Sequence, residues 1–222
     1  GEYRIVPVKI APSLASAPLT CLASVVEELE TAGTDYIHFD VEDGSFVPVM
    51  TLGVKVIGDL RPLTNIPFDV HLMMHDPEWL LPYLIEVGAD RIAVHLEACK
   101  YPRRTLRMIA EMGARAGIAL NPATPLPDLK YLRPYLSFVL TLTTEPELPD
   151  CPFLPEILDK VSSGKKDPAL NGIEWAVDGG IGLDNIGEVV RSGADTVVVG
   201  RAIFKDGEIA TNLRALREAA NS

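Results

Sequence analysis

The fold is decided by a short pattern that the chain repeats, first met as Ala32-Gly33-Thr34-Asp35-Tyr36-Ile37-His38-Phe39-Asp40. The second copy is Val87-Gly88-Ala89-Asp90-Arg91-Ile92-Ala93-Val94-His95, and the third is Ser192-Gly193-Ala194-Asp195-Thr196-Val197-Val198-Val199-Gly200. In each copy a helical pattern ends at a glycine, which can adopt the left-handed conformation at a helix C-terminus. A short apolar strand rich in β-branched residues follows directly. A weaker copy covers 112–120.

Helices that alternate with short, wholly apolar strands indicate a parallel sheet covered by helices. The pattern predicts eight strands, near 8–12, 36–41, 67–72, 91–95, 116–120, 137–142, 173–178 and 195–200. Helical patterns follow these strands, near 19–32, 53–61, 77–86, 101–112, 126–132, 153–163, 183–191 and 208–219. Eight such pairs predict an α/β fold, a single (β/α)₈ TIM barrel that occupies residues 1–222 as one domain.

One alternative fold is an open, doubly wound sheet, which needs a glycine-rich phosphate loop after its first strand. The first strand here ends in Ala11-Pro12-Ser13-Leu14, which is no such loop. No linker interrupts the predicted barrel, and 162–168 is predicted to be an exposed loop.

Composition narrows the partners and the compartment. A net charge of −11 over 222 residues disfavours nucleic acid and anionic membranes as partners. The longest apolar runs are far too short to cross a bilayer, and residues 1–9 lack the basic start and apolar stretch of a secretion signal. Three scattered cysteines, Cys21, Cys99 and Cys151, are typical of reduced thiols. We therefore expect a cytoplasmic protein with a small-molecule partner.

Polar side chains stand where three of the predicted strands end, which is where barrels of this class carry their active sites. The second strand ends in His38-Phe39-Asp40, the third in Asp69-Val70-His71 and the seventh in Val177-Asp178-Gly179-Gly180. His38 and Asp40 are two residues apart, so they point to the same face. Two imidazoles and two carboxylates predict a divalent metal site, since imidazole favours Zn²⁺, Fe²⁺ or Co²⁺ and carboxylates extend the range to Mn²⁺ or Mg²⁺.

Each of these residues also has a structural interpretation. A single His at a strand end is more often a hydrogen-bonded core residue, and an Asp before two glycines often forms a turn. Their coincidence at one end of the barrel favours the metal site. His95 is predicted to support that site from behind, and His75 to lie exposed in a loop. The aspartates that precede strands, Asp35, Asp90 and Asp195, are expected at the opposite end, as stabilising residues.

Six motifs in fixed order link the chain to a known family. They are Ile10-Ala11-Pro12-Ser13, the segment 38–48 (HFDVEDGSFVP), the segment 69–73 (DVHLM), the segment 120–125 (LNPATP), the segment 177–181 (VDGGI) and the segment 200–204 (GRAIF). In this order and spacing they make nearly the whole chain resemble the ribulose-phosphate 3-epimerase family.

The resemblance implies that His38, Asp40, His71 and Asp178 bind one divalent metal (Zn, Fe, Mn or Co). It also implies that Asp40 and Asp178 are the catalytic acid and base. The implied reaction inverts carbon 3 of a ketose phosphate, of the type that converts ribulose 5-phosphate to xylulose 5-phosphate. One carboxylate removes a proton to give a cis-enediolate, and the other returns a proton to the opposite face.

The resemblance further implies how a sugar phosphate is held. Ser13 would contact the substrate and Met73 would form part of an apolar lining beneath it. Gly179, Gly180 and Gly200 would offer backbone N–H groups to the phosphate. The family resemblance also implies a homo-oligomer.

The chain departs from the family at three places. The family's glycine-rich phosphate loop is replaced by Glu145-Pro146-Glu147-Leu148-Pro149-Asp150-Cys151, whose acidic groups would repel phosphate. Arg201 stands where the family has a small residue and is a candidate anion clamp. Glu42 stands where the family has Met and is expected either beside the metal or in solvent.

These departures keep alternative functions open. One is an epimerase of the family that acts on another sugar, such as a hexulose phosphate or an unphosphorylated ketose, and another is a non-catalytic binding protein. The Mg²⁺-dependent decarboxylases with a related barrel use an Asp-x-Lys-x-x-Asp signature. The corresponding segment, Asp40-Val41-Glu42-Asp43, has no lysine, so that chemistry is not expected.

Overall fold

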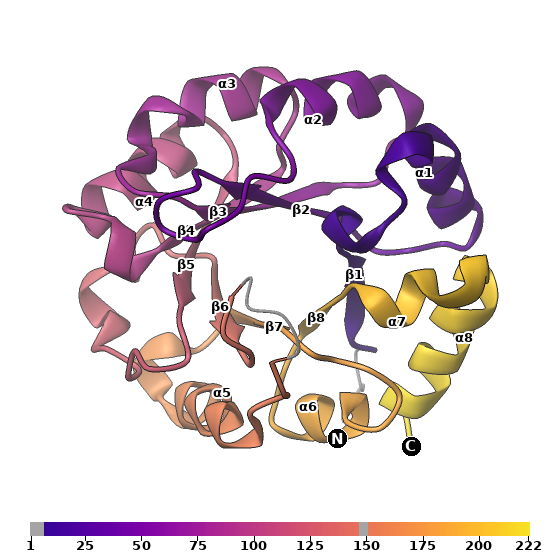
Figure 1. The fold of residues 1–222 in the computed structure, drawn as a ribbon. Helices are drawn as coiled ribbons and strands as arrows, with labels where there is room; N and C mark the ends of the chain where they lie inside the picture. The colour runs from indigo at the N-terminus through magenta and orange to yellow at the C-terminus, as the bar shows by residue number, and fades with distance from the viewer. Residues whose placement is uncertain (1–6, 147–150) are drawn as a thin grey trace.

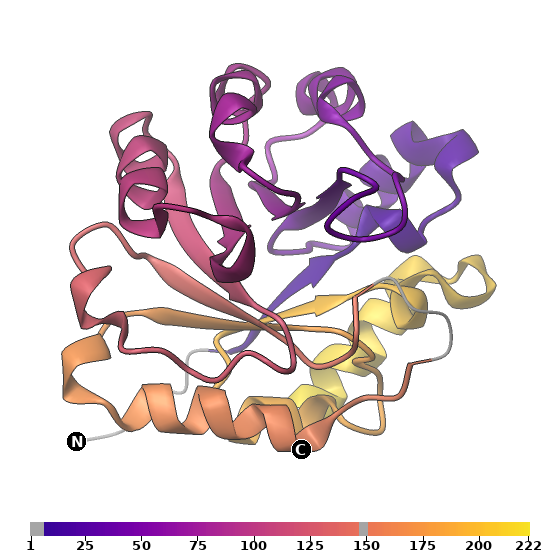
Figure 2. The ribbon, with the colours of Figure 1, turned by 60° about the vertical axis from the view of Figure 1, so that its left-hand side comes forward.

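The computed structural model describes residues 7–146 and 151–222, which form a barrel of eight parallel strands with helices outside it (Figures 1 and 2). The strands are β1 (Lys9–Pro12), β2 (Ile37–Glu42), β3 (Phe68–Met73), β4 (Arg91–His95), β5 (Arg115–Leu120), β6 (Phe138–Leu142), β7 (Glu174–Asp178) and β8 (Thr196–Val199). Neighbours in sequence pair in space, and β8 pairs with β1. Within the described residues the ring closes between β1 and β2 through an isolated parallel bridge from Ser13 to His38. The predicted (β/α)₈ fold is therefore confirmed.

Amphipathic helices cover the barrel because each carries an apolar stripe toward the strands. They are α1 (Leu22–Thr31), α2 (Val54–Leu60), α3 (Leu81–Glu86), α4 (Pro102–Glu111), α5 (Leu158–Lys166), α6 (Ile186–Arg191), α7 (Arg201–Phe204) and α8 (Ile209–Ala220). In α8 the buried side chains are Ile209, Leu213, Leu216 and Ala220, which lie on one side of the helix. No helix in the described part of the chain is long and apolar enough to span a membrane.

The helix predicted over 126–132 is wrong. Only a single 3₁₀ turn, Leu129–Tyr131, forms between β5 and β6. Pro127 and Pro134 bracket this segment, and a proline disfavours helical conformation in the residue before it.

The predicted loop over 162–168 is also wrong for most of its length, because α5 continues to Lys166. The small and polar residues of this stretch suggested a loop, but Gly164 has a packing role. A Cβ atom at position 164 would lie 1.9 Å from Cζ2 of Trp175, a fully buried side chain of β7. The glycine lets the helix approach the barrel wall closely.

The repeated aspartates bind backbone at the end of the barrel where strands begin. A carboxylate oxygen of Asp35 accepts a hydrogen bond from the N–H of Ile10 at 2.9 Å. Asp90 accepts from the N–H of Phe68 at 2.7 Å, and Asp195 accepts from the N–H of Trp175 at 2.8 Å. Each aspartate thus joins the start of one strand to the strand before it. The backbone N–H donors belong to Ile10 in β1, Phe68 in β3 and Trp175 in β7.

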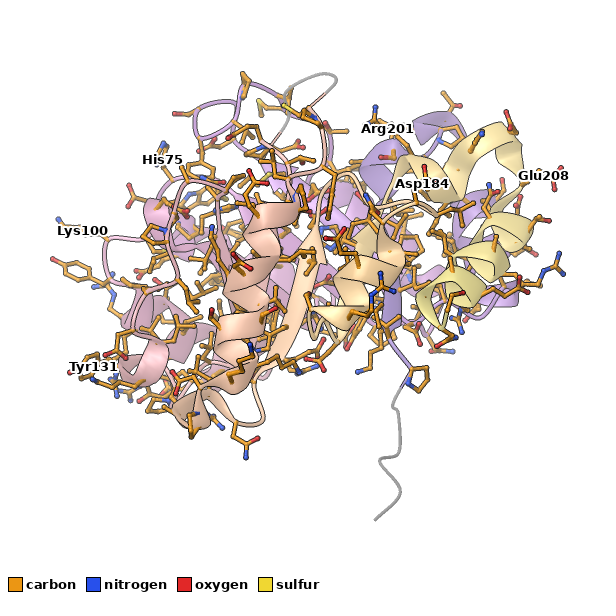
Figure 3. The ribbon with its side chains drawn as sticks, turned by 90° about the horizontal axis from the view of Figure 1, so that it is seen from below. His75, Lys100, Tyr131, Asp184, Arg201 and Glu208 are labelled. Carbon is orange, nitrogen blue, oxygen red and sulfur yellow. The ribbon has the colours of Figure 1, made fainter. Side chains whose placement is uncertain are left out.

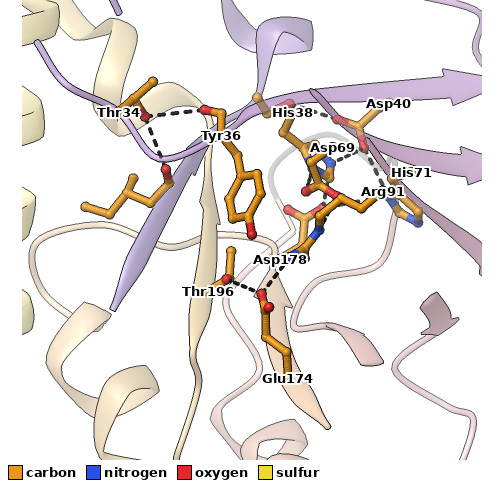
Figure 4. A network of polar contacts seen from close by, with 12 residues as sticks. Thr34, Tyr36, His38, Asp40, Asp69, His71, Arg91, Glu174, Asp178 and Thr196 are labelled. Carbon is orange, nitrogen blue, oxygen red and sulfur yellow. Dashed lines mark hydrogen bonds and ion pairs between the residues drawn. The ribbon is translucent and has the colours of Figure 1, made fainter. Parts of the chain in front are cut away.

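A buried cation occupies the interior of the barrel below the mouth (Figure 4). Nε of Arg91 donates to Asp69 Oδ1 at 2.8 Å, and its Nη1 donates to Glu174 Oε1 at 2.6 Å. The guanidinium carbon lies 4.6 Å from the ring centre of Tyr36 and 3.9 Å from that of Phe138. Burial alone would raise the pKa of Glu174, but the charge of Arg91, the hydroxyl of Thr196 and the charge of Arg115 hold it at about 2.

Candidate active site

The four predicted metal ligands lie together at the mouth of the barrel. His38 and Asp40 come from β2, His71 from β3 and Asp178 from the end of β7, and their donor atoms all lie within 4.8 Å of one another. Asp40 Oδ1 lies 3.1 Å from His38 Nε2 and 3.0 Å from His71 Nδ1. Asp178 Oδ2 lies 3.7 Å and 3.8 Å from the same two nitrogens. This donor set fits a divalent cation of the Zn²⁺, Fe²⁺, Mn²⁺ or Co²⁺ type.

The side of each imidazole that faces away from the cluster is also held. His38 Nδ1 donates to Asp69 Oδ2 at 2.7 Å, and Arg91 fixes the other oxygen of Asp69 (Figure 4). This leaves Nε2 of His38 as the nitrogen that faces the cluster. Carboxylates behind a ligating imidazole typically fix its orientation in this way.

His71 is supported through a second imidazole. His71 Nε2 lies 2.8 Å from Nε2 of His95, as expected for a residue that supports the site from behind. Nδ1 of His95 in turn lies 3.1 Å from Glu97 Oε2. His95 is fully buried, and the ring centre of Phe46 lies 4.7 Å from that of His95. The fourth histidine, His75, is exposed, as predicted.

The two carboxylates of the cluster have opposite electrostatic environments. Burial and the neighbouring Asp40 charge raise the pKa of Asp178 to about 7. Although burial also acts on Asp40, His38 and His71 hold the pKa of that carboxyl well below its usual range. The Ser13 hydroxyl donates to Asp40 Oδ2 at 2.8 Å and fixes that carboxylate further. Neighbouring groups with pKa values pushed apart in this way are typical of an acid and a base that work together.

A pocket of about 450 Å³ opens above the cluster. Its lining includes every residue predicted to contact substrate, namely Ser13, Met73, Gly179, Gly180, Gly200 and Arg201. Two of the glycines lie close to a neighbouring loop. A Cβ atom at position 179 would lie 2.5 Å from Thr144 Oγ1, and one at position 200 would lie 2.3 Å from Ser16 Oγ. Backbone packing requires the first of them, because a Cβ atom at position 179 would also lie 2.8 Å from the backbone N of Thr144. These close approaches bring the loops after β1 and β6 against the pocket.

The three departures from the family pattern have different fates. Arg201 is exposed and lines the pocket at the mouth, far from Tyr131 at the other end (Figure 3). Glu145, Pro146 and Cys151 also line the pocket, whereas the rest of the predicted phosphate-loop replacement, 147–150, lies outside the described residues.

Glu42 lies neither in solvent nor within the group of four ligands. Only 4% of the residue is exposed, and Oε2 accepts a hydrogen bond from the N–H of Thr51 at 2.6 Å. Its Oε1 is buried without a hydrogen-bond partner among the described residues. Burial raises the pKa of this carboxyl above its usual value.

Sequence reasoning missed Asp69, Arg91 and Glu97, which position the ligands from behind. Spacing could have indicated Asp69, because it precedes His71 by two residues and so points to the same face of β3. Arg91 begins an apolar strand, and nothing local shows that its side chain turns inward. Glu97 follows His95 by two residues, but it lies in a 3₁₀ turn where strand alternation does not apply.

Comparison with known proteins identifies the chain. A sequence profile described as the Ribulose-phosphate 3 epimerase family matches residues 9–204. The chain belongs to this family. The ribulose-phosphate 3-epimerase 1 of Cupriavidus necator is 39% identical over 230 residues, which cover 99% of this chain and 95% of that protein. The ribulose-phosphate 3-epimerase of Bacillus subtilis is 36% identical, with 89% and 92% covered.

Membership of the ribulose-phosphate 3-epimerase family makes the chain an enzyme of the isomerase class. Solved structures of more distant sequence share only its fold. A 3-hexulose-6-phosphate synthase superposes with a TM-score of 0.71 at 16% identity, covering 96% of this chain and 99% of that one. The 3-keto-L-gulonate-6-phosphate decarboxylase of Vibrio cholerae gives 0.71 at 19% identity, covering 97% and 98%.

Proposed function

We propose that this epimerase inverts carbon 3 of a ketose phosphate, of the ribulose 5-phosphate to xylulose 5-phosphate type. The observation that carries the proposal is the pair formed by Asp40 and Asp178. The two carboxyls meet at one cluster, and their pKa values are displaced in opposite directions. Inversion needs two groups, because a single base tends to return the proton to the face from which it came.

In the forward direction ionised Asp40 removes the proton from carbon 3, and the C–H electron pair passes into an enediolate of the substrate. Protonated Asp178 then gives its proton to the opposite face of carbon 3. Asp40 releases its proton to solvent and Asp178 regains one before the next turnover, and the reverse reaction exchanges the two roles. The hydroxyl of Ser13 holds Asp40 in place throughout.

A divalent metal held by His38, Asp40, His71 and Asp178 would supply a Lewis acid that stabilises the negative charge of the enediolate. Zn²⁺, Fe²⁺, Mn²⁺ and Co²⁺ are the candidates, since each accepts mixed imidazole and carboxylate ligands. Metal analysis of the purified protein, with melting temperatures measured after chelation and after each metal is restored, tests this part of the proposal. We also propose a homo-oligomer in the cytoplasm, which light scattering and cell fractionation test.

The substrate phosphate would lie at the side of the pocket formed by Gly179, Gly180, Gly200 and Arg201. A second candidate is another sugar, either a hexulose phosphate or an unphosphorylated ketose. The described end of the altered loop favours it, because Glu145 lines the same pocket and would repel a phosphate there. Exchange of the carbon 3 proton with deuterated water, followed over a panel of phosphorylated and free ketoses, separates the two. Turnover of free ketoses alone would rule out the phosphate proposal.

Replacement of the pocket arginine tests the anion side directly. We expect Arg201→Ser to raise KM for a phosphorylated ketose by about tenfold or more, since a lost charged hydrogen bond costs about 1.5–3 kcal/mol. The kcat value should change much less, because Arg201 lies outside the acid-base cluster. Steady-state kinetics at fixed metal concentration give both constants. An unchanged KM would show that Arg201 does not bind the anion.

A further inference from the structure

The contacts behind His71 form a continuous line of hydrogen-bonding groups. His71 Nε2 and His95 Nε2 lie 2.8 Å apart, and His95 Nδ1 lies 3.1 Å from Glu97 Oε2. At the far end Glu97 Oε1 accepts from the N–H of Asn121 at 2.7 Å and from the hydroxyl of Thr124. The backbone N–H of Asn121 can only donate, so the atom of residue 97 that faces it must be a hydrogen-bond acceptor.

The position of every proton along this line follows from the carboxylate. Glu97 can only accept, so Nδ1 of His95 carries a hydrogen. His95 is fully buried, and burial disfavours a charged imidazole, so the ring carries one hydrogen and its Nε2 is left as an acceptor. Nε2 of His71 therefore donates to it, because two rings that meet at 2.8 Å cannot both donate. The remaining nitrogen of His71, Nδ1, lies 3.0 Å from Asp40 Oδ1, and in this tautomer it would offer its lone pair to a metal held between the two groups.

We propose that Glu97 is a positioning residue that selects the tautomer of His71 able to bind the metal. It acts through His95 and does not touch the cluster itself. On the other imidazole ligand, Asp69 does the same directly, by accepting from His38 Nδ1. This inference rests on the proposed metal site, and it adds a role for a residue outside the four ligands.

An isosteric substitution should reverse the line of protons. In Glu97→Gln the amide oxygen must face the N–H of Asn121, so the amide nitrogen faces His95 and donates to its Nδ1. His95 would then donate from Nε2 to His71 Nε2, and the hydrogen of His71 would move to Nδ1. That hydrogen would occupy the lone pair required for metal binding. Metal binding to this variant would therefore require His71 to change tautomer and lose one hydrogen bond of the line, which lowers the metal affinity.

The relative Co²⁺ affinities of Glu97→Gln and Glu97→Ala distinguish this role from simple structural support. Glu97→Ala removes the same negative charge and more contacts, yet it leaves His95 free to keep its proton on Nδ1. We expect Glu97→Gln to weaken Co²⁺ affinity by ~10–100-fold, the range seen when partners of metal ligands are changed. Glu97→Ala should weaken it several-fold less than Glu97→Gln does. A residue with only a packing role gives the opposite order, because glutamine preserves shape and alanine does not.

The experiment is a chelator competition for Co²⁺, with the visible absorption of the bound ion recorded for each protein. Glu111→Gln, an exposed glutamate paired with Arg107 on α4, is the matched control for loss of one charge and should bind as wild type does. In a His95→Phe background, Gln and Ala at position 97 should bind Co²⁺ equally, since the line is already cut. Melting temperatures of the metal-free proteins show whether each variant is folded.

The possible results separate the inference from the proposed function. A wild-type protein that binds none of Co²⁺, Zn²⁺, Mn²⁺ and Fe²⁺ overturns the metal site, and the role of Glu97 with it. A wild-type protein that binds Co²⁺, together with a Gln variant that binds at least as tightly as the Ala variant, overturns the role of Glu97 alone.

Discussion

Asp178→Asn should lower the rate of epimerisation by ~10²–10⁴-fold, the contribution of a positioned acid or base. Burial and the Asp40 charge raise the pKa of the wild-type carboxyl to about 7, so this group can take up and give a proton near neutral pH. The asparagine amide has no acidic proton to give. Asp40 remains, so with saturating metal the variant should still exchange the carbon 3 proton with deuterated water faster than it inverts the centre. Nuclear magnetic resonance follows exchange and inversion in the same sample.

Asp184→Asn is the matched control for this result. Asp184 is exposed in the segment after β7, at the same end of the barrel as Arg201 (Figure 3), and it does not line the pocket. We expect it to epimerise at the wild-type rate. Circular dichroism and melting temperature establish that both variants are folded. An Asp178→Asn enzyme as active as the control would refute the acid-base role of Asp178.

Arg91→Leu should destabilise the protein by about 3–5 kcal/mol, the cost of removing one partner from a buried ion pair. The guanidinium is almost completely buried and is bonded to both Asp69 and Glu174. Leucine would fill part of the space between Tyr36 and Phe138. It would leave the buried Asp69 without its cation, and the partly buried Glu174 would keep only Arg115. The free energy of unfolding, measured with urea at neutral pH, gives the effect. Arg107→Leu, which breaks an exposed pair with Glu111, should cost less than about 1 kcal/mol.

The stability of wild type and that of Arg91→Leu should respond differently to acid. The pKa of Glu174 falls from its ordinary 4.5 to about 2 in the folded protein. A lowered pKa stabilises the folded state above the unfolded value, and this stabilisation is lost as the pH falls from 4.5 toward 2. Without Arg91 the pKa of Glu174 is lowered less, so the difference in stability between wild type and Arg91→Leu should shrink over this range. A difference that is constant with pH would contradict this account.

The sequence predicted the barrel because its signals repeat and agree with one another. The glycine before each of the three patterned strands takes a positive φ, +74° at Gly33, +89° at Gly88 and +107° at Gly193, as a helix C-terminus requires. The meeting of His38, Asp40, His71 and Asp178 was predictable for the same reason, since parallel strands of a barrel end at one mouth.

The features that could not be predicted depend on contacts between distant residues. Helix α5 contains Gly164, and Trp175 of β7 occupies the space that a side chain at position 164 would take. Arg91 looks like a strand residue of the barrel wall, and its inward position is explained only by Glu174, which is 83 residues away. The position of Glu97 depends on Asn121 and Thr124 in the next loop. Local patterns carry no information on such pairs.

The bonds from Asp35, Asp90 and Asp195 to neighbouring strands lie at the end of the barrel away from the pocket. The contacts that stabilise the barrel and the residues of the candidate active site therefore lie at opposite ends of the molecule. Substitutions at the edge of the pocket near Arg201 and Glu145 do not remove these hydrogen bonds. Substrate specificity can therefore change during evolution without a loss of barrel stability that further substitutions would have to offset.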